Sequence, residues 1–110
     1  MTAAPSVVVG AIAFTDIVGF TEYTATRGDA EALEVLSTQE RIVRQALPAG
    51  SRLVKELGDG LLLWFGNCAE AVRTCLDLQS AFEKESAGGD APLWVRIGLH
   101  WGMPTERAAT

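Results

Sequence analysis

The segment of residues 53–65 constrains the fold more than any other part of the chain, because its two apolar runs are separated by Gly58-Asp59-Gly60. An Asp-Gly pair between apolar runs is one of the strongest short-range signals for a β-hairpin. We therefore expect a hairpin over about residues 51–65, with Asp59 at the tip of its turn. From this pattern alone, Asp59 either simply suits a tight turn or has a function there.

Lys55 lies in the first strand of the expected hairpin. Because side chains alternate along a strand, the pattern predicts that Lys55 shares a face with Leu53 and Leu57. A cation among apolar neighbours either extends its charged end to the edge of the sheet or contacts a partner. The hairpin leaves both interpretations open.

A second apolar segment, residues 7–14, is rich in β-branched side chains and predicts a strand buried on both faces. It continues into Thr15-Asp16-Ile17-Val18-Gly19-Phe20-Thr21. An Asp at the end of a buried strand is well placed to bind a metal ion. The amides of a glycine turn and of the following helix can receive phosphate oxygens. Alternatively, Asp16 is only the N-cap of that helix.

The remaining periodicity predicts helices over residues 21–27, 29–47 and from Asn67 onward, and a last strand over residues 93–101. Asp29 and Asn67 are the expected N-caps. The order of elements is that of a β-α-β-β-α-β ferredoxin-like fold of the α+β class, an antiparallel sheet with its helices packed on one face. The side chains expected to face the core are Leu33, Leu36, Val43 and Leu47 in the long helix, Val72, Leu76 and Phe82 in the third helix, and Leu93, Val95, Ile97 and Leu99 in the last strand. Arg96 is expected on the other face of that strand.

Length and charge limit the class of protein. The chain has 110 residues, enough for one domain, and its 9 basic against 14 acidic residues give a net charge of -5. A nucleic-acid-binding surface needs clustered Lys and Arg, so this class is disfavoured. No apolar run reaches membrane-spanning length, and the first residues do not look like a secretion signal. These features predict a cytoplasmic protein without a membrane contact.

Three motifs together resemble the catalytic domain of class III adenylate and guanylate cyclases. They are Phe14-Thr-Asp-Ile-Val-Gly-Phe-Thr21, Lys55-Glu-Leu-Gly-Asp-Gly60 and Val95-Arg-Ile-Gly-Leu-His100. The resemblance runs from about residue 7 to about residue 104. A third glycine-containing segment, Gly88-Gly89-Asp90, is similar to part of the diguanylate cyclase signature, but it follows a helix and precedes Ala91-Pro92, so we interpret it as a linker.

The resemblance implies an adenylate cyclase, a phosphorus-oxygen lyase that forms 3′,5′-cyclic AMP and pyrophosphate from ATP. In this family two metal ions, Mg²⁺ or Mn²⁺, assist the attack of the ribose 3′-hydroxyl on the α-phosphate. By matching motifs, the catalytic and metal-binding carboxylates are Asp16 and Asp59, and Ile17 adds its backbone carbonyl. The phosphate-binding residues are Gly19, Phe20, Thr21 and Arg96.

Lys55 occupies the position that specifies the base in this family, where Lys accompanies ATP and Glu accompanies GTP. A lysine can donate to adenine N1, which is an acceptor, whereas guanine N1 carries a proton. The family also implies a head-to-tail homodimer, or a pair with a related subunit, in which one chain binds the metals and the other reads the base.

The resemblance further implies that residues 1–110 correspond to the N-terminal and central part of the catalytic domain. The family's dimerisation arm, and the later Asp, Asn and Arg that read adenine and stabilise the transition state, have no counterpart after Pro104. We therefore expect this polypeptide by itself to be inactive or weakly active. The alternative hypothesis is a catalytically incomplete cyclase-homology module that binds a nucleotide or a partner subunit.

Overall fold

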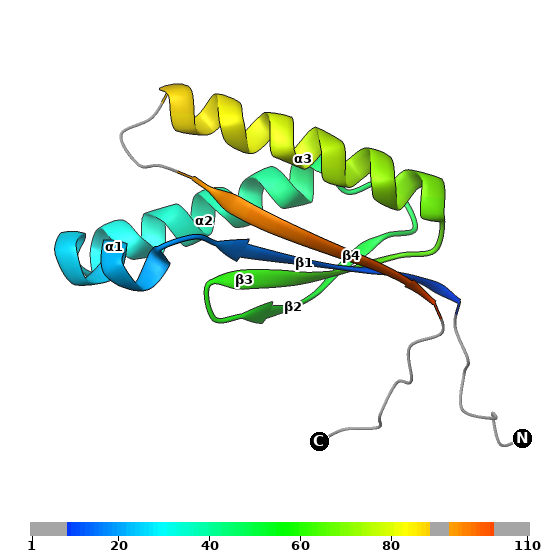
Figure 1. Cartoon of the computed structure of the whole chain (residues 1–110), viewed down its shortest axis with the longest axis horizontal. Helices are drawn as coiled ribbons and strands as arrows, with labels where there is room; N and C mark the ends of the chain where they lie inside the picture. The colour runs from blue at the N-terminus through cyan, green and yellow to red at the C-terminus, as the bar shows by residue number, and fades with distance from the viewer. Residues whose placement is uncertain (1–8, 89–92, 103–110) are drawn as a thin grey trace, which may run out of the picture.

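The computed structural model describes residues 9–88 and 93–102. Their four strands form one antiparallel sheet in the order β2-β3-β1-β4, and three helices accompany it (Figure 1). The α+β, ferredoxin-like alternation expected from the sequence is confirmed. The elements are β1 (Gly10–Ile17), α1 (Phe20–Arg27), α2 (Asp29–Ala46), β2 (Arg52–Leu57), β3 (Gly60–Phe65), α3 (Cys68–Gly88) and β4 (Val95–Gly102).

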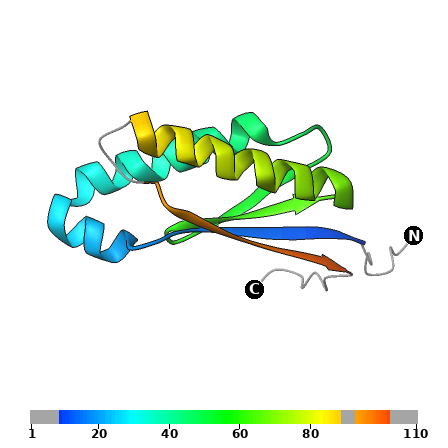
Figure 2. The same cartoon turned by 45° about the horizontal axis from the view of Figure 1, so that its top comes forward.

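The helices lie on one face of the sheet, which gives the molecule two layers (Figure 2). The core fills the space between these layers, and its largest fully buried apolar side chains are Phe65, Phe82, Leu63, Leu78 and Val43. The other face of the sheet, which we call the open face, is not covered by any described element. The prediction that β1 is buried on both faces is therefore wrong, and Phe14 on the open face is 48% exposed. An antiparallel sheet needs only one covered face to form a core.

Two of the helix faces differ from the expected ones. Leu33 in α2 is 62% exposed, and Val72 and Leu76 in α3 are also exposed. Other residues of each helix, some small or polar and some large, take the buried positions. These buried residues are Ala32, Val35, Gln39, Ile42 and Val43 in α2, and Ala71, Thr74, Leu78 and Phe82 in α3.

One of the two predicted N-caps, Asn67, is confirmed, and the other, Asp29, is wrong. The side chain of Asn67 accepts a hydrogen bond of 2.9 Å from the Glu70 N–H, so Asn67 caps α3 as predicted. Asp29 is not a cap, because the N-cap position of α2 is taken by Gly28, which has φ 89° and makes no side-chain cap. A positive φ suits glycine, and it lets the chain turn from α1 directly into α2.

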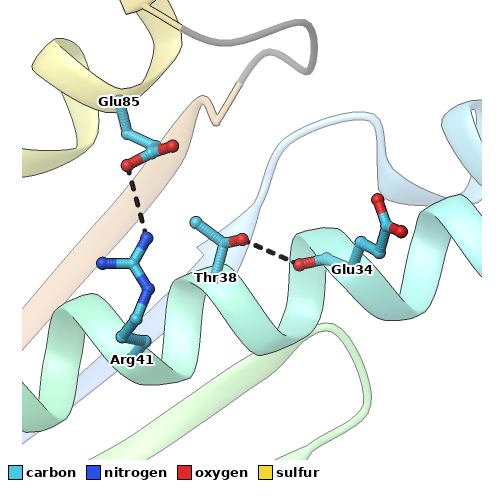
Figure 3. A network of polar contacts seen from close by, with 4 residues as sticks. All are labelled: Glu34, Thr38, Arg41 and Glu85. Carbon is cyan, nitrogen blue, oxygen red and sulfur yellow. Dashed lines mark hydrogen bonds and ion pairs between the residues drawn. The ribbon is translucent and has the colours of Figure 1, made fainter.

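An exposed ion pair joins α2 to α3 (Figure 3). Arg41 donates to the Glu85 carboxylate at 3.4 Å, and one turn earlier the Thr38 hydroxyl donates to the backbone carbonyl of Glu34. Exposed pairs of this kind contribute little to stability, so the apolar core beneath them holds the helices in place. Within the described residues, no helix combines the length and the apolar character needed to span a bilayer.

Candidate active site

Asp16 and Asp59 come together on the open face, although 43 residues separate them in the sequence. Asp16 lies near the end of β1, directly opposite Gly60 of β3, and the Ile17 N–H donates to the Asp59 carbonyl at 3.3 Å. Burial and the nearby Asp16 carboxylate raise the pKa of Asp59. The fold therefore places two carboxylates, one from a strand and one from a turn, side by side.

Two glycines permit this approach. Gly58 and Asp59 form the two-residue loop of the hairpin, and Gly58 has φ 63°, a conformation that side chains other than glycine rarely adopt. Gly60 is needed for a different reason, because there is no room for a side chain at this position. A Cβ atom there would lie 1.9 Å from the carbonyl oxygen of Thr15. The Gly-Asp-Gly sequence is therefore needed to bring the turn against the end of β1.

Arg96 completes the charged group on this face. It lies opposite Asp16 in the β1–β4 ladder, as its predicted strand face requires, and its guanidinium donates to the Asp16 carboxylate. The Arg96 side chain is 73% exposed, so one side of the guanidinium pairs with Asp16 while much of it faces solvent. A guanidinium of this kind can bind phosphate oxygens.

The start of α1 lies just beyond Asp16. Gly19, with φ 72°, is the N-cap residue of this helix and makes no side-chain cap, so Asp16 does not cap it. The first intrahelical bond runs from the Tyr23 N–H to the Gly19 carbonyl. The earlier amides, including those of Phe20 and Thr21, have no acceptor within the helix, and such amides bind anions readily. Thr21 is exposed, whereas Phe20 packs against the core.

The donor groups fit a hard divalent cation. Among the residues that the structure describes, no cluster of three or more His, Cys, Asp or Glu side chains is present. Mg²⁺ and Mn²⁺ do not require one, since they are commonly held by one or two carboxylates together with water and substrate phosphates. Ile17 has a buried apolar side chain and offers only its backbone carbonyl. Two adjacent carboxylates that repel each other are stabilised when a cation lies between them.

Lys55 lies on the open face, and not on the face of Leu53 that the alternation predicted. The β2–β3 register shifts between Leu53 and Lys55, so Leu53 is opposite Leu63 and Lys55 is opposite Leu62. Leu63 is buried beneath the helices, whereas Leu62 faces the other way. The prediction that Lys55 shares a face with Leu53 is therefore wrong, because a bulge absorbs one residue and reverses the alternation.

The lysine does not join the carboxylates within this chain. Lys55 is exposed on the edge strand β2, and none of the ion pairs among the described residues includes it. It is two strands across and two residues along from Asp16, roughly 12 Å by the usual spacings of a sheet. The structure thus brings together Asp16, Asp59, Arg96 and the start of α1, and leaves Lys55 apart from them.

The sequence reasoning missed Gln39. This glutamine is 1% exposed, and it hydrogen-bonds both to Thr15, the neighbour of Asp16, and to the backbone of Asp59. Its position on the buried face of α2, four residues after Val35 and three before Ile42, is the signal that could have revealed it. A polar residue at such a position requires a buried partner.

Comparison with known proteins agrees with this arrangement. A family model described as "Adenylate and Guanylate cyclase catalytic domain" matches residues 4–107. A bacterial light-regulated adenylyl cyclase is 27% identical, with a TM-score of 0.80, over 89% of this chain and 55% of its own. An adenylate cyclase of Trypanosoma brucei is 22% identical, with a TM-score of 0.69, over 93% of this chain and 59% of its own. No curated protein sequence matches the chain.

The active GGEEF domain of a diguanylate cyclase from Vibrio cholerae is also similar in structure, with 13% identity and a TM-score of 0.69 over 84% of this chain and 61% of its own. At this identity the likeness concerns the fold alone, as it does for the Trypanosoma enzyme. The chain spans between half and two thirds of the length of these three structures. Of the Gly88-Gly89-Asp90 segment, α3 includes Gly88, and the other two residues lie outside the described part.

Proposed function

Because the chain belongs to the adenylate and guanylate cyclase catalytic domain family, we propose that it provides the metal- and phosphate-binding part of an adenylate cyclase. The reaction converts ATP to 3′,5′-cyclic AMP. The ribose 3′-oxygen loses its proton and bonds to the α-phosphorus, while the bond from that phosphorus to the bridging oxygen breaks and pyrophosphate leaves. The observation that carries this proposal is the convergence of Asp16 and Asp59 beside the uncapped start of α1.

In this proposal Asp16 and Asp59 hold two divalent cations, Mg²⁺ or Mn²⁺, with the Ile17 carbonyl as a further ligand. Bound there, the cations lower the pKa of the ribose hydroxyl and neutralise the triphosphate. The closeness of the two carboxylates supports this role, because a cation between them offsets the repulsion that, together with burial, raises the pKa of Asp59. Their positions on a strand and on a tight turn restrict their movement, which favours a defined separation between the ligands.

The triphosphate of the nucleotide is bound by the start of α1 and by Arg96. The backbone amides of Gly19, Phe20 and Thr21 donate to phosphate oxygens at the positive end of the helix dipole. In this proposal Asp16 would exchange its contact with Arg96 for the cation, and the released guanidinium would then be free to bind the terminal phosphates of the nucleotide. The exposed guanidinium supports this exchange, because little has to move when its partner changes.

The base is read by Lys55 of a second subunit. Within one chain Lys55 lies apart from the carboxylates, as a site shared between two head-to-tail subunits requires. Lys55 donates to adenine N1, and this donor favours ATP over GTP. The exposed apolar side chains of the open face, Phe14 among them, support a subunit contact on this side.

The test is Mn²⁺-dependent ATP binding to the 110-residue chain, measured by isothermal titration calorimetry. We expect Asp16→Ala and Asp59→Ala each to weaken this binding about tenfold or more, because each removes a charged ligand of the cation. Asp77→Ala is the matched control, since Asp77 is an exposed carboxylate on α3. Circular dichroism verifies that all variants keep the fold.

Two results would contradict the proposal. Unchanged affinity in both site variants removes the metal assignment, and an equal loss in Asp77→Ala shows a general effect of charge. Formation of cyclic AMP by the loaded protein supports the enzyme itself. Nucleotide binding without turnover, even with a family partner chain, favours the second candidate, a cyclase-homology module that binds a nucleotide or a subunit.

A further inference from the structure

We infer that Gln39 of α2 is a positioning residue that fixes the separation of the two carboxylates on the open face. The inference rests on the proposed function, because it concerns the metal-binding role of Asp16 and Asp59. Gln39 is on the helix side of the sheet and does not reach the open face itself. It acts through the backbone that carries the two aspartates.

Three hydrogen bonds form the connection. The Leu61 N–H donates to Thr15 Oγ1 at 3.0 Å, the Thr15 hydroxyl donates to Gln39 Oε1 at 2.7 Å, and Gln39 Nε2 donates to the Asp59 carbonyl at 3.5 Å. Thr15 directly precedes Asp16 in β1. One side chain from the helix layer therefore contacts the strand next to the first carboxylate and the turn that carries the second.

The burial of these groups makes the connection specific. Thr15 is 3% exposed and Gln39 is 1% exposed, so both side chains depend on protein groups for their hydrogen bonds. Every fully buried side-chain nitrogen or oxygen in the described residues has a hydrogen-bond partner. A core position that serves packing alone is better filled by an apolar side chain, because burying an amide is unfavourable unless it is fully bonded. The glutamine thus indicates a requirement beyond packing.

The Asp59 carbonyl receives two donors, the Ile17 N–H at 3.3 Å and Gln39 Nε2 at 3.5 Å. The first comes from β1 and the second from α2, so the turn is restrained from two directions. Without Gln39 the turn keeps one of these contacts and gains freedom to move relative to Asp16. Residues that orient metal ligands in this way usually change metal affinity about 10- to 100-fold when they are replaced.

The experiment measures Mn²⁺ binding to the 110-residue chain without nucleotide, by electron paramagnetic resonance of the free ion. Gln39→Met keeps the length of the side chain and removes its amide. We expect it to weaken Mn²⁺ binding about tenfold or more. Val43→Ala is the matched control, because Val43 is a fully buried residue one turn further along α2 that takes no part in the three hydrogen bonds.

Both variants are measured at a temperature at which circular dichroism shows them to be folded. A residue that only stabilises the fold does not alter the affinity of the molecules that stay folded. Parent-like affinity in Gln39→Met overturns the inference, as does an equal loss in Val43→Ala. If Gln39→Met does not fold, two variants of Thr15 test the same hydrogen bond from its other end. Thr15→Val removes the hydroxyl that donates to Gln39, and Thr15→Ser keeps it. The inference requires weaker binding in the first and parent-like binding in the second.

Asp16→Asn separates this inference from the proposed function. Loss of binding in Asp16→Asn together with parent-like binding in Gln39→Met disproves the positioning role and leaves the metal site in place. Parent-like binding in Asp16→Asn, or no Mn²⁺ binding by the parent, disproves the metal site and the positioning role with it.

Discussion

The bulge in β2 decides which face of the sheet Lys55 occupies. Without it, the lysine would lie beneath the helices among apolar side chains, where a charge is unfavourable. With it, Lys55 is opposite Leu62 and exposed. A cation without an ion-pair partner among the described residues is available to a ligand or to another subunit, and this supports the base-reading role that we propose for Lys55 from the family motif.

At the scale of this residue we predict that Lys55→Glu lowers the preference for ATP over GTP. The change replaces a donor to adenine N1 with an acceptor. Losing a specific hydrogen bond costs about 1 to 3 kcal/mol, which corresponds to roughly tenfold or greater discrimination. The measurement is kcat/KM for ATP and GTP in a protein with a complete site. Full reversal also requires a change at the family's second base-reading residue, the Asp that has no counterpart in this chain.

Arg52→Glu is the matched control for charge reversal. Arg52 lies on the same strand, opposite Trp64, and its guanidinium is 5.8 Å from the centre of that ring. If Arg52→Glu changes the base preference as much as Lys55→Glu does, the effect is a general one of charge. If Lys55→Glu keeps the parent's preference, the lysine has no role in reading the base.

At the scale of elements, local chemistry was enough to predict the sheet. The apolar runs gave the strands, and the Asp59-Gly60 pair between them gave the hairpin. The loop itself is Gly58-Asp59, where glycine adopts the positive φ that the tight turn requires. The choice of buried helix face was not local. In α2 an exposed Leu33 is adjacent to a buried Ala32, so the buried face depends on how the helix packs against the rest of the chain, and against α1 and α3 in particular.

In the candidate site, too, some features follow from local sequence and others depend on the tertiary fold. The sequence placed Asp16 near a strand end and Asp59 in a turn, but their adjacency depends on the strand order and on the pairing of Asp16 with Gly60. Gln39 escaped notice because its partners lie 20 and 24 residues away along the chain. The bulge beside Lys55 had no local signal either, since Val54 is an ordinary strand residue.

A carboxyl pair also links α2 to β2. Glu40 and Glu56 both line a cavity of about 160 Å³ between α2 and the hairpin. The pKa of Glu56 is raised, chiefly by the nearby Glu40 carboxyl. The pKa of Glu40 is lowered, first by its hydrogen bond with Arg44 and then by the nearby Glu56 carboxyl. Both shifts favour a state in which Glu56 is protonated and can donate to an ionised Glu40.

These two shifts give opposite dependences of stability on pH. The contribution of Glu56 is complete below its ordinary pKa of 4.5 and is lost as the pH rises through the raised value. The contribution of Glu40 is present above 4.5 and is lost as the pH falls through the lowered value. The link between α2 and β2 is thus strongest near pH 4.5 and weakens as the pH rises through the raised pKa of Glu56.

We predict that Glu56→Gln raises the unfolding temperature at pH 7, because an amide donates to Glu40 at every pH. The gain should shrink as the pH is lowered toward 4.5, where Glu56 itself is the donor. Thermal unfolding by circular dichroism between pH 4 and pH 7.5 provides the measurement. Glu34→Gln, an exposed change on the same helix, controls for the loss of one charge. A gain of the same size at every pH would show that Glu56 does not donate to Glu40.

At the scale of the whole molecule, the open face and the start of α1 form one continuous binding side. In Figure 2 α2 and α3 lie above the sheet and α1 lies beyond one end of it, so the charged group and the exposed apolar residues share the uncovered side. Its partly or largely exposed apolar side chains are Ile12, Phe14, Leu57, Leu62 and Trp64. Apolar surface around a charged site is typical of a place where two protein surfaces meet.

A polypeptide of residues 1–110 should therefore bind metal and phosphates better than it turns over ATP. Catalysis requires interactions that are stronger in the transition state than in the ground state. In the family these come from a later Asn and Arg, whereas in our proposal Asp16, Asp59 and Arg96 act already on the bound substrate. We expect little or no cyclic AMP from this polypeptide with Mn²⁺ and ATP. Activity should appear on addition of a full-length family domain whose own metal aspartates are both replaced by alanine.

The mixture tests whether two chains share one site. The added domain supplies the Asn and Arg but cannot bind the metals, so turnover in the mixture has to use the carboxylates of the shorter chain. The same mixture prepared with Asp16→Ala in the shorter chain should stay inactive, which excludes residual activity of the added domain. Robust cyclic AMP formation by residues 1–110 alone would contradict the prediction. So would a mixture that stays inactive although sedimentation shows that the two chains associate, because the metal half would then not come from this chain.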